Sequence, residues 1–257
     1  MSLTLGRGPW SKHRAGHAGE PMPERVAYLE PWPRRIRAEV GGQVLLESDR
    51  VQALHRTGEM MQLYVPRADV DESMLTRGGT STEDQLGELT RWHAEGLDGR
   101  AEDVVWSVAP TAGAPAGLDQ MVGVDLDAVD RWYEEDEEPL GHPRDPYHRV
   151  DTRRSTRHVV VRIGGELVAD THHPVALFET SLPTRWYVPR DDVTVELAPT
   201  ATHTVCPYKG VASYWTAVGR DDVAWSYEAP LAESQGALGT VCILGEGVTT
   251  TVDGVEV

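Results

Sequence analysis

Short runs of β-branched and aromatic residues, separated by polar turns, recur along most of the chain. Residues 35–40 (RIRAEV) and 158–163 (HVVVRI) each lead into a Gly-Gly pair, at 41–42 and 164–165. Such a pair supplies the positive φ angles that a two-residue hairpin turn needs. Further runs of the same kind lie at 185–188, 194–197, 211–218 and 223–227. The pattern predicts a mainly β protein.

One stretch, residues 125–138 (DLDAVDRWYEEDEE), has helical spacing instead. Its apolar and aromatic residues recur at helical intervals, and they are Leu126, Val129, Trp132 and Tyr133. We therefore predict a short helix that follows the first β domain. The five consecutive acids at 134–138 are interpreted as the solvated end of this helix, with a partner-binding tail as the alternative.

The chain repeats itself at an offset of 123 positions. The segment YVPRADV at 64–70 matches YVPRDDV at 187–193. After a four-residue insertion in the first copy, DVVWS at 103–107 matches DVAWS at 222–226. Collinear self-similarity over this length indicates that the chain contains two copies of one fold.

The repeat and the turn-rich segments divide the chain into four parts. We predict an N-terminal arm at 1–33, a first β domain at 34–138, a connector at 139–151 and a second β domain at 152–257. The arm is rich in glycine, proline and charge, and the connector has three prolines without apolar periodicity. The two β domains should share one topology with the 123-residue offset intact.

The composition narrows the cellular setting and the partners. The 257-residue chain carries 41 acidic against 24 basic residues, a net charge of −17, which repels phosphate backbones and anionic lipid surfaces. Nucleic acid and membranes are therefore disfavoured as partners. No stretch reaches the roughly 18 apolar residues of a membrane helix, and the first residues lack a signal-peptide pattern. We predict a cytoplasmic protein and leave its oligomeric state open.

The sequence predicts neither a metal site nor a cofactor. The two cysteines, Cys206 and Cys242, lack the CxxC spacing of a structural zinc site. His142 and His148 in the connector have no third ligand nearby on a regular element.

The densest chemistry lies at 202–215 (THTVCPYKGVASYW). Pro207 favours an extended Cys206 and presets a turn, so Cys206 should end one strand while Tyr208 and Lys209 sit on the turn. Lys209 could favour the Cys206 thiolate, bind an anion or form a Schiff base. The plainer alternative is a buried cysteine beside a solvated lysine.

The first copy serves as an internal control for this stretch. It has EDQLG at 83–87 where the second copy has CPYKG at 206–210, so only the glycine is shared. We interpret the first copy as a degenerate scaffold and place the site in the second copy. His203, the base nearest to Cys206, should lie on the other strand face, which argues against a Cys–His dyad.

These motifs resemble a bacterial family, the domain of unknown function 427 (DUF427) family, which also carries a nucleotidyltransferase label. The matching segments are YVP at 187–189, CPYKG at 206–210, ASYW at 212–215, VAWSY at 223–227 and the connector HPRDPYHRVD at 142–151. The resemblance implies a tandem member with a β-tent (Mss4-like) fold in each domain. Relatives with that fold often carry a zinc knuckle of two CxxC pairs, which this chain cannot build.

The residues do not support nucleotidyltransferase activity. Phosphoryl transfer needs carboxylates that hold Mg²⁺ and a cradle for the triphosphate. The acidic pairs at 191–192 and 221–222 would point to opposite strand faces. A phosphate-binding glycine loop is also missing.

We therefore predict a small-molecule-binding module whose pocket lies in the second domain. Its aromatic residues would stack on the ligand, and its cations would contact an anionic group. The predicted lining is Arg185, Tyr187, Cys206, Tyr208, Lys209, Trp215, Trp225 and Tyr227. The alternatives are an enzyme that uses Cys206 or Lys209, a nucleotidyltransferase-like activity, and a structural or interaction protein.

Overall fold

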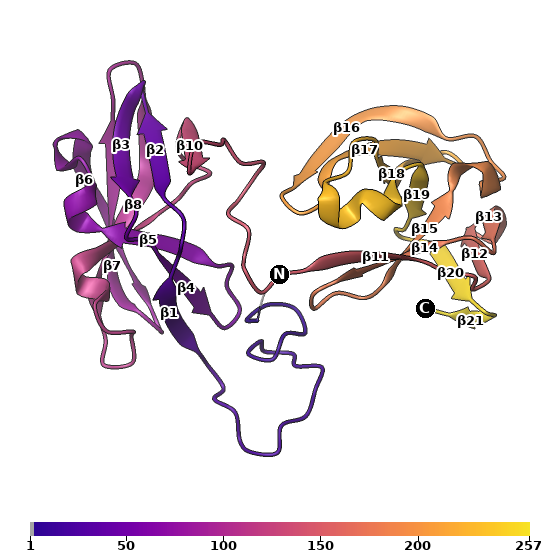
Figure 1. Cartoon of the computed structure of the whole chain (residues 1–257), viewed down its shortest axis with the longest axis horizontal. Coiled ribbons are helices and arrows are strands. Elements are labelled where there is room, and N and C mark those ends of the chain that lie inside the picture. Colours follow the sequence, from indigo (N-terminus) through magenta and orange to yellow (C-terminus); the bar gives the residue numbers. More distant parts are fainter. Residues whose placement is uncertain (1–2) are drawn as a thin grey trace. The chain divides into compact units, whose positions relative to one another are not determined.

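The computed structural model describes residues 3–257, which divide into two compact units. The first unit ends at Asp145, and the second spans Pro146–Val257. Each unit is built from antiparallel β-sheets that are joined by short turns (Figure 1). The prediction of a mainly β protein is confirmed.

The first unit contains a seven-stranded sheet in the order β1-β4-β5-β9-β8-β7-β6 and a three-stranded sheet in the order β10-β2-β3. Its strands are β1 (Ala27–Pro31), β2 (Ile36–Val40), β3 (Gln43–Ser48), β4 (Gln52–Arg56), β5 (Gln62–Pro66), β6 (Leu75–Glu83), β7 (Gly87–Glu95), β8 (Arg100–Pro110), β9 (Met121–Val124) and β10 (Arg131–Glu134). Its 3-10 turns are η1 (Arg67–Asp69), η2 (Glu72–Met74) and η3 (Leu118–Gln120).

The second unit contains a seven-stranded sheet in the order β11-β14-β15-β19-β18-β17-β16 and a four-stranded sheet in the order β13-β12-β20-β21. Its strands are β11 (Val150–Arg154), β12 (Val159–Ile163), β13 (Glu166–Thr171), β14 (Val175–Glu179), β15 (Arg185–Pro189), β16 (Ala198–Cys206), β17 (Gly210–Ala217), β18 (Arg220–Tyr227), β19 (Thr240–Ile243), β20 (Val248–Val252) and β21 (Val255–Glu256). Its 3-10 turns are η4 (Arg190–Asp192) and η5 (Ala232–Ala237).

The two units repeat one topology. Their seven-stranded sheets correspond strand by strand, from β1 with β11 to β6 with β16, and in the small sheets β10, β2 and β3 correspond to β20, β12 and β13. Tyr64 on β5 pairs with Gly123 on β9, and Tyr187 on β15 pairs with Cys242 on β19 in the same way. The predicted duplication is therefore confirmed.

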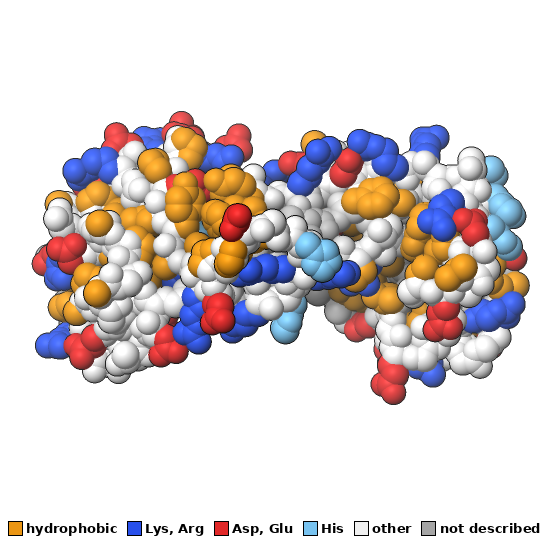
Figure 2. Space-filling model, turned by 90° about the horizontal axis from the view of Figure 1, so that it is seen from below, with side chains coloured by type: hydrophobic (Ala, Val, Ile, Leu, Met, Phe, Trp, Pro, Cys, Tyr) orange, Lys and Arg blue, Asp and Glu red, His pale blue; other side chains and the backbone are white. Residues whose placement is uncertain are grey.

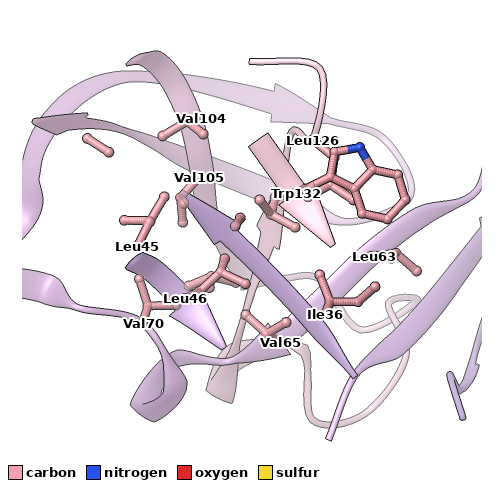
Figure 3. Close-up of a cluster of buried hydrophobic side chains, with 14 of the residues drawn as sticks. Ile36, Leu45, Leu46, Leu63, Val65, Val70, Val104, Val105, Leu126 and Trp132 are labelled. Atoms are coloured by element: carbon pink, nitrogen blue, oxygen red, sulfur yellow. The ribbon is translucent and has the colours of Figure 1, made fainter. Parts of the chain in front are cut away.

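The main core of each unit lies between its two sheets. In the first unit, Ile36 and Leu46 from the small sheet meet Leu63 and Val65 from the large one (Figure 3). Residue Tyr64, between those last two, points to the opposite face of the large sheet and joins a second cluster. The second unit repeats this division into two clusters. The two faces of each large sheet therefore have different surroundings.

The prediction of a helix at residues 125–138 is wrong. Residues Arg131–Glu134 form strand β10, which pairs with β2. Trp132 is buried in the core, whereas Tyr133 points the other way and its ring lies 4.1 Å from the Arg37 guanidinium. A turn followed by a short strand buries residues at uneven intervals, and over so few positions these intervals mimic a helical period.

Two segments outside the predicted β domains also join the sheets. Strand β1 lies within the predicted N-terminal arm and pairs with β4, while β11 begins within the predicted connector and pairs with β14. The preceding part of the arm packs on the turn after β4. There the backbone N–H of Gly58 donates to the Thr4 carbonyl at 3.0 Å, and the Thr57 hydroxyl donates to the Trp10 carbonyl at 2.8 Å.

Candidate functional site

The CPYKG segment forms the tight turn that the sequence predicts. Strand β16 ends at Cys206, β17 begins at Gly210, and the backbone N–H of Lys209 donates to the Cys206 carbonyl at 3.2 Å. Gly210 and its counterpart Gly87 both have positive φ angles, of 105° and 117°. A Cβ would lie 2.2 Å from a backbone oxygen at Gly87 and 3.1 Å from one at Gly210, so the corner of the first unit admits only glycine without rearrangement.

Lys209 is held in a buried ion pair rather than solvated. Its Nζ lies 2.5 Å from Oε2 of Glu179, and Oε1 of Glu179 lies 3.2 Å from Nε2 of His148. The His148 ring in turn contacts Tyr208, with 4.2 Å between ring centroids. Burial alone would raise the pKa of Glu179, but hydrogen bonds and charge from His148 and Lys209 outweigh it and lower the pKa to about 2. Glu179 therefore stays ionised, and its carboxylate pairs with the side-chain nitrogen of Lys209.

The first unit has a partly buried ion pair at the same corner, with a cation at the position where the second unit has an acid. Arg56 occupies the position of Glu179, Glu83 occupies the position of Cys206, and the two form a salt bridge. Arg56 also donates to Oε1 of Gln62 at 3.1 Å. The corner of the first unit has thus kept an ionic contact although it has lost the CPYKG residues.

Several of the predicted pocket residues form a packed cluster on one face of the large sheet. Tyr187, Tyr208 and Tyr227 are buried, and Cys206 and Trp225 pack against them. Burial raises the pKa of both Tyr187 and Tyr227 well above the usual range, so both phenols are neutral.

A tryptophan–tyrosine hydrogen bond inside this cluster is common to both units. The Trp225 indole N–H donates to the Tyr187 hydroxyl at 3.1 Å, and the Trp106 indole donates to Tyr64 at 2.8 Å. Because the pair occurs in both copies, it belongs to the fold that they share.

Trp215 lies on the other face of the sheet. Its indole N–H donates to Oγ of Ser226 at 2.9 Å, and the Arg190 guanidinium lies 4.2 Å from its ring centroid. It packs with the core between the two sheets, apart from Tyr187 and Trp225. The structure therefore brings five of the eight predicted residues together and places Trp215 elsewhere.

Arg185, another of the predicted residues, lines a cavity of about 450 Å³. The backbone pairing of β15 with β19 runs from Pro189 to Tyr187 and stops there, so the strands part on either side of the cavity. Its lining comprises Arg157, Pro183, Thr184, Arg185, Trp186, Cys242, Ile243, Leu244, Thr250 and Val257. Among the described contacts, the Arg185 guanidinium has neither an ion-pair nor a hydrogen-bond partner.

The walls of this cavity reflect an exchange of aromatic residues between the copies. The first copy has Trp32 and Leu63 where the second has Ser155 and Trp186. Arg34 and Arg157 occupy equivalent positions in the two copies, and each guanidinium lies near the tryptophan of its own copy. Arg34 lies 5.1 Å from the ring centroid of Trp32, and Arg157 lies 5.5 Å from that of Trp186. Trp186 thereby gives the cavity of the second copy an aromatic wall, whereas the first copy has the aliphatic Leu63 at this position.

The first unit has a cavity of about 350 Å³ at the corresponding position. Residues 60–63 line it as 183–186 line the second cavity, and Val124 and Asp125 take the places of Ile243 and Leu244. Its charged lining differs, because it includes Glu83, Arg91, Asp125 and Asp127. The sequence did not predict this cavity in the first copy, which was interpreted as degenerate. The cavity lies where the pairing of two strands ends, and no short sequence pattern marks such a place.

The acidic pairs of the second unit are engaged with hydroxyl groups. Asp192 accepts a hydrogen bond from Thr171, Asp221 accepts one from Thr216, and Asp222 accepts one from Thr202 at 2.7 Å. Within residues 3–257, no group of three or more His, Cys, Asp or Glu side chains could hold a metal ion. No helix in the same range is long and apolar enough to cross a membrane.

These features define a tandem protein of two copies of one antiparallel β fold, each with a cavity where its central strands part. The family model described as domain of unknown function (DUF427) matches residues 28–135 and 151–254, one region in each unit. The chain belongs to this family. A search of curated proteins finds no match.

Proposed function

We propose that the protein is a small-molecule-binding module and that the cavity beside Arg185 receives a compact organic anion. The observation that supports this most is the unpartnered, half-buried Arg185 guanidinium in a cavity whose other walls are mainly apolar. A guanidinium in such surroundings has lost part of its hydration, so a ligand carboxylate would gain charge-assisted, bidentate hydrogen bonds there.

The rest of the lining favours a flat, apolar body on that anion. Trp186 offers an indole edge or face, and Ile243 and Leu244 offer aliphatic surface. Among the described residues, no Asp or Glu side chain lines this cavity, in contrast to the corresponding one in the first unit. Cavities of a few hundred Å³ with an apolar wall and one polar anchor are typical small-molecule sites.

In this proposal the CPYKG cluster supports the site and does not contact the ligand. Cys242 belongs to both the cavity wall and the buried cluster with Tyr187. The cluster therefore fixes the point at which β15 and β19 part. We also expect each unit to have a β-tent fold and the protein to be cytoplasmic.

The enzyme alternative finds less support. A Schiff-base lysine needs a free amine, but the side-chain nitrogen of Lys209 donates to Oε2 of Glu179 at 2.5 Å. Cys206 has no imidazole as a partner in the described contacts. Binding without chemistry is the function that the geometry supports best.

The test is a titration of the whole chain with naphthalene-2-carboxylate, followed by NMR, with naphthalene-2-methanol as the uncharged analogue. We expect the carboxylate to bind more tightly and Arg185→Ala to weaken it at least tenfold, because one charge-assisted hydrogen bond contributes about 1.5–3 kcal/mol. Gln62→Ala, at the corresponding position of the first unit, is the matched control and should leave the affinity unchanged. Carboxylate binding that Arg185→Ala leaves intact would refute the proposal.

A further inference from the structure

A second cavity of the second unit, of about 460 Å³, lies at the other ends of β15 and β19. Arg154 ends β11, His173 precedes β14, and Thr240 begins β19, so three elements converge on it. Ser155 and Thr156 add two more hydroxyl groups. Its lining, within residues 3–257, includes no acidic side chain. We infer that this cavity binds the phosphate group of a small phosphomonoester.

The Arg154 guanidinium of this cavity is available for a ligand. Arg154 is exposed, and neither its guanidinium nor the His173 ring has a partner among the described contacts. The neighbouring Arg153 is different, because it forms an ion pair with Asp151. The Thr240 hydroxyl donates to the Ala237 carbonyl at 2.7 Å, so Ser155 and Thr156 are the hydroxyl donors beside Arg154. A guanidinium without a carboxylate partner, with such donors beside it, suits a tetrahedral oxyanion.

At the corresponding place in the first unit, the basic side chain is neutralised by an acidic partner. Arg50 stands at the position of His173 there and forms an ion pair with Asp69. In the second unit the matching acid, Asp192, accepts a hydrogen bond from Thr171 and makes no ion pair in the described residues. The first copy also has Pro-Trp-Pro at 31–33 in place of Arg-Ser-Thr at 154–156. The basic, hydroxyl-rich lining is thus specific to the second unit.

The remaining walls indicate that the ligand is larger than free phosphate. Val175, Pro189 and Leu238 supply apolar surface, and the Leu238 side chain is half exposed at the rim. An exposed leucine beside an anion site offers contact to the organic part of a phosphomonoester. The net charge of −17 does not prevent this, because basic and acidic side chains are interspersed over the visible face of each unit (Figure 2). Local potential at a site depends on its nearest charges.

The experiment is isothermal titration of the whole chain with phenyl phosphate and with inorganic phosphate. We expect saturable binding, tighter for phenyl phosphate, and a loss of at least tenfold in Arg154→Ala. Arg153→Ala is the matched control and should change the affinity less than twofold, as should Arg185→Ala in the other cavity. Thermal unfolding of each variant would show that it is folded.

Three outcomes would overturn the inference. The first is the absence of saturable binding for both phosphates. The second is an equal loss in Arg153→Ala and Arg154→Ala, which would indicate diffuse surface charge. The third is equal affinity for inorganic and phenyl phosphate, which would remove the role of the apolar wall. The Arg185 proposal does not depend on any of them, because it concerns a different cavity and ligand.

Discussion

The buried ion pair at the CPYKG turn provides the sharpest stability prediction. Lys209→Met removes the ammonium and keeps most of the side-chain volume, so Glu179 loses the partner at 2.5 Å and keeps only His148. Both members of the pair are largely buried, with side-chain exposures of 13% for Lys209 and 9% for Glu179. A carboxylate so enclosed cannot recover its lost interaction from water.

The magnitude follows from the pKa of Glu179. The lowering from 4.5 to about 2 corresponds to roughly 3 kcal/mol of preferential stabilisation of the carboxylate in the folded state. Two partners share this stabilisation, and breaking a buried pair typically costs about 3–5 kcal/mol. We therefore expect Lys209→Met to lower the free energy of unfolding of the second unit by about 2–3 kcal/mol at pH 7.

The assay is urea unfolding combined with hydrogen exchange, which assigns the loss of stability to the second unit.

The contribution of Glu179 to the free energy of unfolding depends on pH in a defined direction. Because the folded pKa of Glu179 lies below its unfolded value, the stabilisation is fully present above about pH 4.5 and is lost as the pH falls through about 2. The difference between the wild type and Lys209→Met should therefore shrink in that window.

Two further variants make the reasoning refutable. Arg153→Met removes the cation from an exposed ion pair with Asp151 and should cost no more than about 1 kcal/mol. Lys209→Met combined with Glu179→Leu removes both charges and should be less destabilised than Lys209→Met alone. If Lys209→Met is no less stable than Arg153→Met at pH 7, the ion pair does not stabilise the turn.

Other predictions concern the first unit and the cysteines. A Cβ at Gly123 would lie 2.2 Å from the Trp106 ring, so Gly123→Ala should displace the indole and cost about 1–3 kcal/mol, measurable by urea unfolding. Burial raises the pKa of Cys242 to about 12, so iodoacetamide should leave it unmodified at pH 8, and rapid labelling in the folded state would contradict its burial. Cys206, which is half-buried, should be modified no faster than a free thiol, and faster modification would revive the nucleophile hypothesis.

Local signals in the sequence were sufficient for most of the fold. The Gly-Gly pairs at 41–42 and 164–165 lie in the hairpins between β2 and β3 and between β12 and β13, as predicted. The offset of 123 positions predicted the shared topology, because segments that match in the same order along the chain form equivalent strands. The helix predicted at 125–138 failed because its apolar spacing fits both a helical period and a turn followed by a strand.

The site was harder to predict because its contacts join distant parts of the chain. Glu179, which pairs with Lys209, and His148, which contacts Glu179, lie on other segments, and no motif links them to CPYKG. Strand alternation tells which residues of one strand share a face, but the faces of different strands could not be matched from the sequence. The cavity beside Arg185 depends on where two strand pairings end, which is a tertiary property.

Ligand-dependent hydrogen exchange of the whole chain would test most directly whether the second unit binds an organic anion beside Arg185. With saturating naphthalene-2-carboxylate, we predict slower amide exchange in residues 183–186 and 242–244, which line the cavity. Residues 60–63 and 124–125, which line the corresponding cavity of the first unit, should exchange at an unchanged rate. Protection confined to the first unit, or absent from both cavities at saturation, would contradict the account.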